Sequence, residues 1–305
     1  MDNTKRISLQ AVRTAYIVVA ISHLYLLVLV SESANATDPL GAIALPGCQD
    51  SCDGVPIPYP FGIGPSCCLS RDFQVSCNAT NDTYTPYLFR AARVNYPVSS
   101  QCYNSTTKKV EYERYYAMLS GSSFRFSDNK NKFLVIGCDT LAFANFSDGQ
   151  NYNWVGCASR CSSLEGLTNG SCSGLGCCQT DIPKATTIIN VDFSAWYNNS
   201  DVYSFSRCSY ATLMENDGFI FNTNYITTDY LKGLQMPLVL DWSIGNTTCD
   251  VAQNNSSSYA CISKNSVCLN SSSGQGYLCN CSHGYGGNPY LEGGCQGLSL
   301  SAPLS

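Results

Sequence analysis

The sequence predicts a mainly β, disulfide-rich, secreted protein, and three observations support this class. Only 13% of the 305 residues are charged and 44% are hydrophobic, with many Tyr, Asn, Ser and Gly, which is typical of loop-rich extracellular β proteins. All 19 cysteines lie from Cys48 onward, and such density persists only where thiols are oxidised. Several segments alternate apolar and polar residues with a period of two, as half-buried strands do.

The first 36 residues have the layout of a secretory signal peptide. Three basic residues precede an apolar run over residues 16–30, and Ala34-Asn35-Ala36 provides the small residues of a cleavage site. A signal anchor that stays in the membrane is the alternative, but the run is short for a membrane span. No second apolar run of spanning length follows. We therefore expect residues 1–36 to be removed and the mature chain to be secreted.

Residues 46–64 form a proline-rich ribbon that opens the mature chain. Cys48 and Cys52 are followed by prolines at 56, 58 and 60. Each proline fixes φ near about −65° and favours an extended residue before it, so we expect an extended ribbon here. Proline lacks a backbone donor and is confined to sheet edges. The ribbon is therefore expected to lie along a sheet edge or to wrap the surface, pinned by disulfides, and to serve as scaffold.

The clearest strand patterns in the rest of the chain cover residues 133–136, 187–196 and 238–244. In the second of these, Ile189, Val191 and Phe193 share one face and polar residues occupy the other. Helix signals are few. The best covers residues 228–233, where a threonine can cap one or two turns and a glycine can end them.

The cysteines are expected to pair with one another. Metal binding is the competing account of spacings such as Cys157-x3-Cys161, but the mature chain would hold one histidine, His283, and secreted cysteines normally pair. We therefore predict no metal site and no cofactor. An odd number of cysteines leaves at least one thiol over, and the adjacent Cys67 and Cys68 are its expected source.

Asn-x-Ser/Thr sequons occur throughout the mature chain, and each one that is used must lie at the surface. Of the eleven, Asn280 is the weakest candidate because it stands between Cys279 and Cys281. We predict N-glycosylation at Asn78, Asn81, Asn104, Asn145, Asn169, Asn198, Asn246, Asn254, Asn255 and Asn270.

Residues 246–296 resemble an EGF-like module. They contain six cysteines, with one residue between the fourth and the fifth and a Gly-Tyr-Gly-Gly run at 284–287. The resemblance implies the pairs Cys249–Cys268, Cys261–Cys279 and Cys281–Cys295. A module of this size is too small for a large core and depends on its disulfides. Residues 297–305 are expected to be an unstructured tail.

Five motifs between residues 46 and 296 point to one family. They are Ile57-Pro58-Tyr59-Pro60-Phe61-Gly62, Phe73-Gln74-Val75-Ser76-Cys77, Gly176-Cys177-Cys178-Gln179, Val239-Leu240-Asp241-Trp242 and Gly286-Gly287-Asn288-Pro289-Tyr290. Together they resemble the extracellular region of plant wall-associated receptor kinases. The resemblance implies a galacturonan-binding domain over residues 37–245 that binds cell-wall pectin without catalysis. It also implies a location in the extracellular matrix or cell wall, and at the plasma membrane for full-length relatives.

The chain departs from the family pattern at two places. The family continues past this module into a second EGF-like repeat, a membrane span and a Ser/Thr kinase, whereas this chain reads residues 297–305 and stops. We interpret it as a truncated extracellular region. Asn246-Thr247-Thr248 replaces the acidic pair that precedes the first cysteine of calcium-binding EGF-like modules, so no protein-held calcium is expected.

The charge distribution is compatible with an acidic polysaccharide. The whole chain carries −5; residues 1–36 contain three basic and two acidic residues, so their removal leaves −6. Residues 90–132 hold eight basic and three acidic residues, a local +5 among interleaved aromatics. Bases bind carboxylates and aromatic rings stack on sugars. We therefore predict pectin contacts from Arg90, Arg93, Lys108, Lys109, Arg114, Lys130 and Lys132.

Three alternatives remain open. The basic segment could be a set of solvated strand faces, with its aromatics in the core and Glu111 and Glu113 paired with nearby lysines. The chain could instead act as a protein-interaction module that pairs or competes with full-length wall-associated receptor kinases. A pectin-modifying enzyme is least favoured, because His283 lies within a disulfide loop, a poor scaffold for a catalytic triad.

Overall fold

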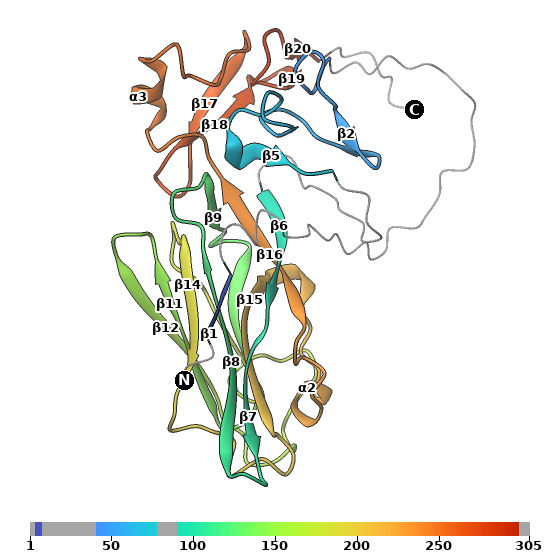
Figure 1. Ribbon diagram of the computed structural model, residues 1–305, viewed down its shortest axis with the longest axis vertical. Helices are drawn as coiled ribbons and strands as arrows, with labels where there is room; N and C mark the ends of the chain where they lie inside the picture. Colours follow the sequence, from blue (N-terminus) through green and yellow to red (C-terminus); the bar gives the residue numbers. More distant parts are fainter. Residues whose placement is uncertain (1–3, 8–40, 78–90, 299–305) are drawn as a thin grey trace, which may run out of the picture. The chain divides into compact units, whose positions relative to one another are not determined.

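The computed structural model describes residues 4–7, 41–77 and 91–298 (Figure 1). Outside these ranges lie most of the predicted signal peptide, the predicted tail beyond residue 298, and the predicted site residues Asn78, Asn81 and Arg90. The described chain is mainly strand and is crossed by nine disulfides. The predicted mainly β, disulfide-rich fold class is confirmed.

The chain divides into two compact units, which we call the sheet unit and the cysteine-rich unit. The sheet unit comprises Met1–Val18 and Arg90–Trp242, and the cysteine-rich unit comprises Val19–Phe89 and Ser243–Ser305. The second unit therefore combines the proline-rich ribbon with the EGF-like segment, from opposite ends of the chain. The predicted domain boundaries, 37–245 and 246–296, stay a prediction.

A nine-stranded sheet dominates the sheet unit, in the order β12-β11-β14-β8-β7-β15-β10-β13, with β1 beside β8. Strand β1 is parallel to β8, and the strands of the main path are antiparallel. The bounds are β1 (Thr4–Ile7), β7 (Ser99–Asn104), β8 (Lys109–Met118), β10 (Asn131–Ile136), β11 (Thr140–Ser147), β12 (Tyr152–Ser159), β13 (Cys177–Thr180), β14 (Ile188–Phe193) and β15 (Cys208–Glu215).

A second, three-stranded antiparallel sheet has the order β6-β16-β9. Its strands are β6 (Ala91–Pro97), β9 (Phe124–Phe126) and β16 (Gln235–Trp242). The unit also contains a 3-10 turn, η2 (Asn216–Gly218), and the short helix α2 (Asn224–Thr227).

The main core lies where the inward faces of the two sheets meet. Strand β14 shows how the sequence builds it: Ile189, Val191 and Phe193 are buried while Asn190 is exposed, so the predicted alternation is confirmed. Strands β6, β9 and β16 contribute buried side chains to the same cluster. Apolar burial of this kind is the main favourable term in folding.

Strands β10 and β15 are buried on both faces, because a second cluster covers their other side. That cluster joins Leu134 and Tyr210 to Phe221 and to Ile226 of α2. Seven of the eight residues of β15 are buried. Apolar residues therefore occur on both faces of β15 and do not alternate strictly with polar ones, as expected where both faces are covered.

The side chain of Asn131 joins the two sheets. Its Nδ2 donates to the carbonyl oxygens of Ser127 and Val239, at 2.8 and 2.7 Å, and its Oδ1 accepts from the backbone N–H of Val239 at 2.9 Å. Asn131 starts β10 and is fully buried, whereas Val239 lies in β16. The Val239 carbonyl also accepts from the backbone N–H of Ser127 at 3.1 Å, so the amide adds to that bond and pairs the N–H of Val239 and the carbonyl of Ser127.

The predicted helix over residues 228–233 is wrong, since that stretch is a turn and the helix α2 precedes it. Thr228 closes α2 instead of starting a new helix: its backbone N–H and its hydroxyl both donate to the carbonyl of Asn224. The next residue, Asp229, forms an ion pair with Arg207. Local side-chain bonds of this kind compete with helix continuation.

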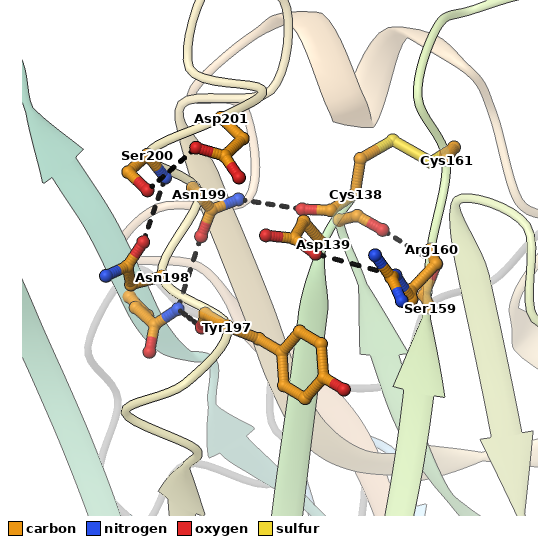
Figure 2. Close-up of polar contacts among 12 residues, drawn as sticks. Cys138, Asp139, Ser159, Arg160, Cys161, Tyr197, Asn198, Asn199, Ser200 and Asp201 are labelled. Carbon is orange, nitrogen blue, oxygen red and sulfur yellow. Dashed lines mark hydrogen bonds and ion pairs between the residues drawn. A yellow bond between two sulfur atoms is a disulfide. The ribbon is translucent and has the colours of Figure 1, made fainter.

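A buried polar network anchors the segment between β14 and β15 (Figure 2). Asn199 donates from Nδ2 to the carbonyls of Cys138 and Ser206, and its Oδ1 accepts from Gln101 Nε2 and Ser209 Oγ. Its φ of 63° lies in the left-handed region that asparagine tolerates better than most residues. Every polar atom of this buried amide therefore has a partner, as burial requires.

The cysteine-rich unit is built from short strands and turns. They are β2 (Ser51–Cys52), β3 (Val55–Pro56), β4 (Gly62–Ile63), η1 (Arg71–Phe73), β5 (Gln74–Val75), α3 (Cys249–Gln253), β17 (Ser266–Asn270), β18 (Tyr277–Cys281), β19 (Tyr285–Gly287) and β20 (Cys295–Gly297). Each strand pairs with one other strand of the unit, as β2-β3, β4-β5, β17-β18 and β19-β20.

The strands of the ribbon pair as β2 with β3, and β4 with β5, and take no part in the strand order of the large sheet. The disulfides of the ribbon, Cys48–Cys67 and Cys52–Cys77, close within residues 48–77. The side chain of Asn288, from the EGF-like segment, donates from Nδ2 to the carbonyls of Ile43 and Tyr59, at 3.0 and 2.7 Å. Proline removes ladder donors from the ribbon, but its free carbonyls can still accept these side-chain bonds.

Replacing Asn199 tests the buried network. Asn199→Ala loses all four hydrogen bonds and places a Cβ without a polar group at a left-handed φ. We expect the free energy of unfolding to fall by about 2–4 kcal/mol, as measured by urea denaturation with disulfides intact. Asn199→Gly is the matched control, because glycine accepts this φ without strain. The network contributes nothing if Asn199→Gly retains parental stability.

Replacing Asn288 tests how the ribbon is held. Asn288→Asp removes both Nδ2 donors but keeps the Oδ1 that accepts from the backbone N–H of Tyr290. We expect peptides covering residues 41–64 to exchange amide hydrogens faster than in the parent, because the variant leaves the Tyr59 carbonyl without this donor and the Ile43 carbonyl with the backbone N–H of Tyr59 alone. Glu292→Ala, an exposed change in the same loop, should leave exchange unaltered. Equal exchange in both variants contradicts this role for Asn288.

Candidate functional site

The basic residues predicted to bind pectin are divided between strands and turns of the sheet unit. Arg93 lies in β6, Lys109 and Arg114 in β8, and Lys132 in β10, whereas Lys108 and Lys130 occupy the turns before β8 and β10. Arg90 lies outside the described residues. The structure therefore describes six of the seven side chains.

Three of these bases pair with carboxylates from distant parts of the sequence. Arg93 Nη2 lies 2.6 Å from Glu215 Oε1, and Arg114 Nε lies 2.8 Å from Asp192 Oδ1. Lys132 Nζ pairs with Asp181 Oδ1. None of these acids belongs to residues 90–132, so the local sum of +5 overstates the charge that these bases can offer a ligand.

Two of the three pairs connect neighbouring strands of the fold. Arg93 and Glu215 join β6 to β15 with both side chains largely covered, at 23% and 15% exposure. Arg114 and Asp192 join β8 to β14. Breaking a partly buried pair leaves one charge without its partner. These arginines therefore have a structural role that is separate from any ligand.

Lys108 and Lys109 are the most available bases of the predicted set. They lie at the turn between β7 and β8, where both are exposed, and no acidic partner pairs with either among the described residues. The turn is shaped by Asn104, whose Oδ1 accepts from the backbone N–H of Thr106 and Thr107. Both ammonium groups can thus approach an anion with little cost of desolvation.

The structure does not gather all the predicted bases. Register places the start of β8 near the start of β15, across β7, and the start of β10 near the end of β15. Lys109 is level with residue 206 and Lys130 with residue 216 along the line of β15. Because strands advance about 3.3 Å per residue, the two lysines lie roughly 33 Å apart along the strand direction. The two groups therefore stand at opposite ends of the sheet.

The aromatics of the basic segment have separate roles. Tyr96 and Phe126 are buried in the main core, and Tyr115 and Phe124 pack against it. Tyr112 also packs against this core, and the guanidinium carbon of Arg114 lies 4.1 Å from its ring centroid, a cation–π contact. The interleaving of bases and aromatics thus mainly reflects strand alternation between the core and the opposite sheet face.

Asp241 lies beside the basic segment and was not among the predicted site residues. It is opposite Arg125 in the pairing of β16 with β9. Burial raises the pKa of the Asp241 carboxyl, while a hydrogen bond from Ser127 and the positive charge of Lys130 act in the opposite direction. Burial also lowers the pKa of Arg125. Asp241 lies in the Val239-Leu240-Asp241-Trp242 motif, and this motif was the sequence signal that could have identified Asp241 as a candidate site residue.

Sequons and cysteines complete the predicted site residues. Among the described residues, no predicted sequon asparagine is fully buried. The disulfides Cys249–Cys268, Cys261–Cys279 and Cys281–Cys295 are the pairs that the EGF-like resemblance implies. Cys67 pairs with Cys48, and Cys68 is the one free cysteine, in the doublet where an unpaired thiol was expected.

The described residues contain no cluster of His, Cys, Asp and Glu side chains with the geometry of a metal site. None of their helices has the length and apolar character needed to span a bilayer.

Asp241 should give the stability of the protein a measurable pH dependence. A raised pKa means that the folded state holds the proton more tightly than the unfolded state, so this group lowers stability as the pH rises from about 4. In urea denaturation between pH 4 and 7, we expect Asp241→Asn to gain stability relative to the parent as the pH increases. Asp217→Asn, at an exposed residue of the same unit, is the control. Parallel pH profiles for parent and Asp241→Asn would contradict the assignment.

Comparison with known proteins identifies the relatives of the chain. Residues 48–111 match the wall-associated receptor kinase galacturonan-binding family. Wall-associated receptor kinase 2 of Arabidopsis thaliana is 35% identical over 261 residues, which cover 83% of this chain and 34% of the relative. Wall-associated receptor kinase 4 is 35% identical over 267 residues, covering 84% and 35%, and wall-associated receptor kinase-like 6 is 28% identical over 321 residues, covering 92% and 48%.

The chain spans about a third of the length of the first two relatives. No solved structure matches it. The matched segment, residues 48–111, ends within β8 and includes the exposed turn with Lys108 and Lys109. The chain is thus similar over more than four-fifths of its length to the wall-associated receptor kinases, and its residues 48–111 match the galacturonan-binding family.

Proposed function

We propose that this protein binds cell-wall pectin, as homogalacturonan or oligogalacturonides, in the plant extracellular matrix and without catalysis. The observation that carries the proposal is the match of residues 48–111 to a galacturonan-binding family. The related receptor kinases support it, because pectin binding would be the task of an extracellular receptor region.

Within the predicted basic set, the turn with Lys108 and Lys109 is the best candidate for the first contact with pectin. It is exposed, it lies within the matched segment, and it has no acidic partner among the described residues. Galacturonate repeats carry one carboxylate per sugar, so two adjacent ammonium groups can bind neighbouring repeats. Arg90, Arg93, Arg114, Lys130 and Lys132 remain in the proposal, with Arg93, Arg114 and Lys132 also held in ion pairs.

A protein-interaction function, pairing or competing with full-length wall-associated receptor kinases, is the alternative. The two functions are separated by a pull-down of such receptors with the purified chain. Capture that is abolished by pectinase indicates a shared polysaccharide, whereas capture that survives pectinase indicates direct contact. An enzyme would instead shorten oligogalacturonides, which chromatography of the incubated oligomers detects.

Charge reversal at the turn tests the proposed contact. Lys108→Glu with Lys109→Glu should weaken retention on de-esterified pectin roughly tenfold, since two exposed ion pairs together contribute about 1–2 kcal/mol. Retention of the parent should fall with salt, and it should be absent on fully methyl-esterified pectin, which lacks the carboxylates.

The matched control is Lys184→Glu with Lys232→Glu. It makes the same change in charge at two other exposed lysines of the sheet unit. The control should retain most of the parental binding. If both double variants bind equally well, Lys108 and Lys109 do not contact pectin; if the parent itself fails to bind de-esterified pectin, the proposed function is wrong.

A further inference from the structure

The sheet unit carries exposed aromatic side chains on the face of β12 and β11 that points away from the main core. On β12, Tyr152 and Trp154 are 67% and 63% exposed, although both stand in a regular strand. On the neighbouring strand β11, Ala144 and Phe146 point into the core and are fully buried. We call the opposite side, formed by Tyr152, Trp154, Phe143 and Asn145, the aromatic face.

Strand register places Asn145 at the centre of the aromatic face. It lies directly opposite Trp154 on β12 and opposite Asn190 on β14. Phe143 precedes it by two residues and therefore projects from the same side of β11. Side chains that are directly opposite in antiparallel strands have Cβ atoms about 5 Å apart. A group attached to Asn145 would therefore emerge between these rings.

The two rings beside Asn145 are already held in place. Phe143 and Trp154 meet edge to face, with ring centroids 6.4 Å apart. The Phe143 ring lies over Gly156, where an added Cβ would come within 3.3 Å of its Cδ1 atom. Glycine at this position thus lets Phe143 lie flat across β12. The rings form a fixed apolar surface that the fold does not cover within the described residues.

Asn145 is also the asparagine of a sequon, Asn145-Phe146-Ser147. Its side chain is partly exposed, but its Oδ1 atom is buried and accepts no hydrogen bond among the described residues. In contrast, the amide nitrogens of Asn104 and Asn254 donate to Glu111 and to the carbonyl of Asp250. The fold therefore does not use the amide of Asn145 as it uses those two.

We propose that Asn145 carries an N-linked glycan whose first N-acetylglucosamine packs on Trp154 and Phe143 and covers the aromatic face. Attachment joins Asn145 Nδ2 to C1 of the sugar, breaks the bond from C1 to the pyrophosphate of a lipid-linked oligosaccharide donor, and releases the amide proton. The apolar C–H face of a pyranose can then bury ring surface that is otherwise in water.

The charges on this side of the sheet favour a neutral sugar over a polyanion. The nearest charged groups on β14 and β8 are Asp192, opposite Phe143, and its ion-pair partner Arg114. The two charges cancel, so they give pectin no net attraction. The inference concerns a modification of the chain and does not depend on pectin binding.

The distribution of tryptophan points in the same direction. The chain has three tryptophans. Trp242 is 4% exposed, whereas the two exposed ones, Trp154 and Trp196, both lie beside sequons. Trp196 is 91% exposed and precedes the sequon asparagine Asn198 by two residues. A single exposed aromatic such as Trp196 is common, whereas neighbouring exposed aromatics such as Tyr152 and Trp154 form a patch of the kind that marks an interaction surface. A glycan at Asn145 would cover that patch.

The experiment uses the full chain secreted by a eukaryotic host that keeps glycans in the high-mannose form. Trp196→Phe makes Trp154 the one exposed tryptophan. Mass spectrometry of glycopeptides should find Asn145 occupied. Acrylamide should quench Trp154 weakly in this protein and severalfold more strongly after Asn145→Gln. The thermal unfolding midpoint of Asn145→Gln should be about 2–4 °C lower than that of the parent. A shift of this size corresponds to a loss of about 1 kcal/mol in the free energy of unfolding for a unit of this size.

Enzymatic trimming on the folded parent provides a test that does not depend on secretion of the variant. Endoglycosidase H leaves the first N-acetylglucosamine on Asn145, so the protection of Trp154 should remain. Removal of the whole glycan with peptide N-glycosidase should abolish it. Asn246→Gln, which deletes an exposed sequon preceded by a buried isoleucine, should change neither quenching nor unfolding temperature.

Three results would overturn the proposal. The first is an unoccupied Asn145 in the secreted protein. The second is equal quenching of Trp154 before and after complete deglycosylation. The third is a result with the glycan-free protein: added oligogalacturonide protects Trp154 from quenching as strongly as the glycan was expected to. That result would assign the aromatic face to pectin instead.

Discussion

The sheet unit depends on the way its two sheets share one core, and the amide of Asn131 fixes that arrangement. A nine-stranded and a three-stranded sheet cannot exchange ladder bonds where they meet, so polar backbone groups at the junction need another partner. Asn131 supplies it by pairing with both the N–H and the carbonyl of Val239. Since an unpaired buried amide is costly, these bonds hold β16 at one position relative to the start of β10. The apolar residues then fill the space between the sheets.

The same arrangement decides what becomes of the basic segment. Once β6 lies against β15 and β8 against β14, Arg93 reaches Glu215 and Arg114 reaches Asp192. The bases are thereby used within the fold, while the turn before β8 leaves Lys108 and Lys109 exposed. The proposed pectin contact is therefore narrower than the segment of +5 suggests. Beside the aromatic face, Arg114 is paired with Asp192, and the neutral glycan that we propose there does not require a free base.

The cysteine-rich unit is stabilised in a different way from the sheet unit. Its buried apolar residues are few, and Phe61 packs edge to face on Phe73 at 5.2 Å. Five disulfides cross-link its described residues, two in the ribbon and three in the EGF-like segment. No disulfide joins the ribbon to the EGF-like segment. The side-chain amide of Asn288 links the two by hydrogen bonds instead. Small units with limited cores commonly depend on such covalent and polar links.

The sequence by itself determined the fold class, the strand alternation of Ile189, Val191 and Phe193, and the doublet that contains the free thiol Cys68. Local periodicity and cysteine spacing are properties of neighbouring residues, so they can be read without a fold. The sequence also placed Lys108 and Lys109 in the candidate site. Only the tertiary structure decided that Arg93 has Glu215 as its partner, 122 residues away, that the ribbon is held by Asn288, and that Trp154 faces Asn145. These pairings arise from strand register and chain closure, and no local pattern encodes which distant residues will meet.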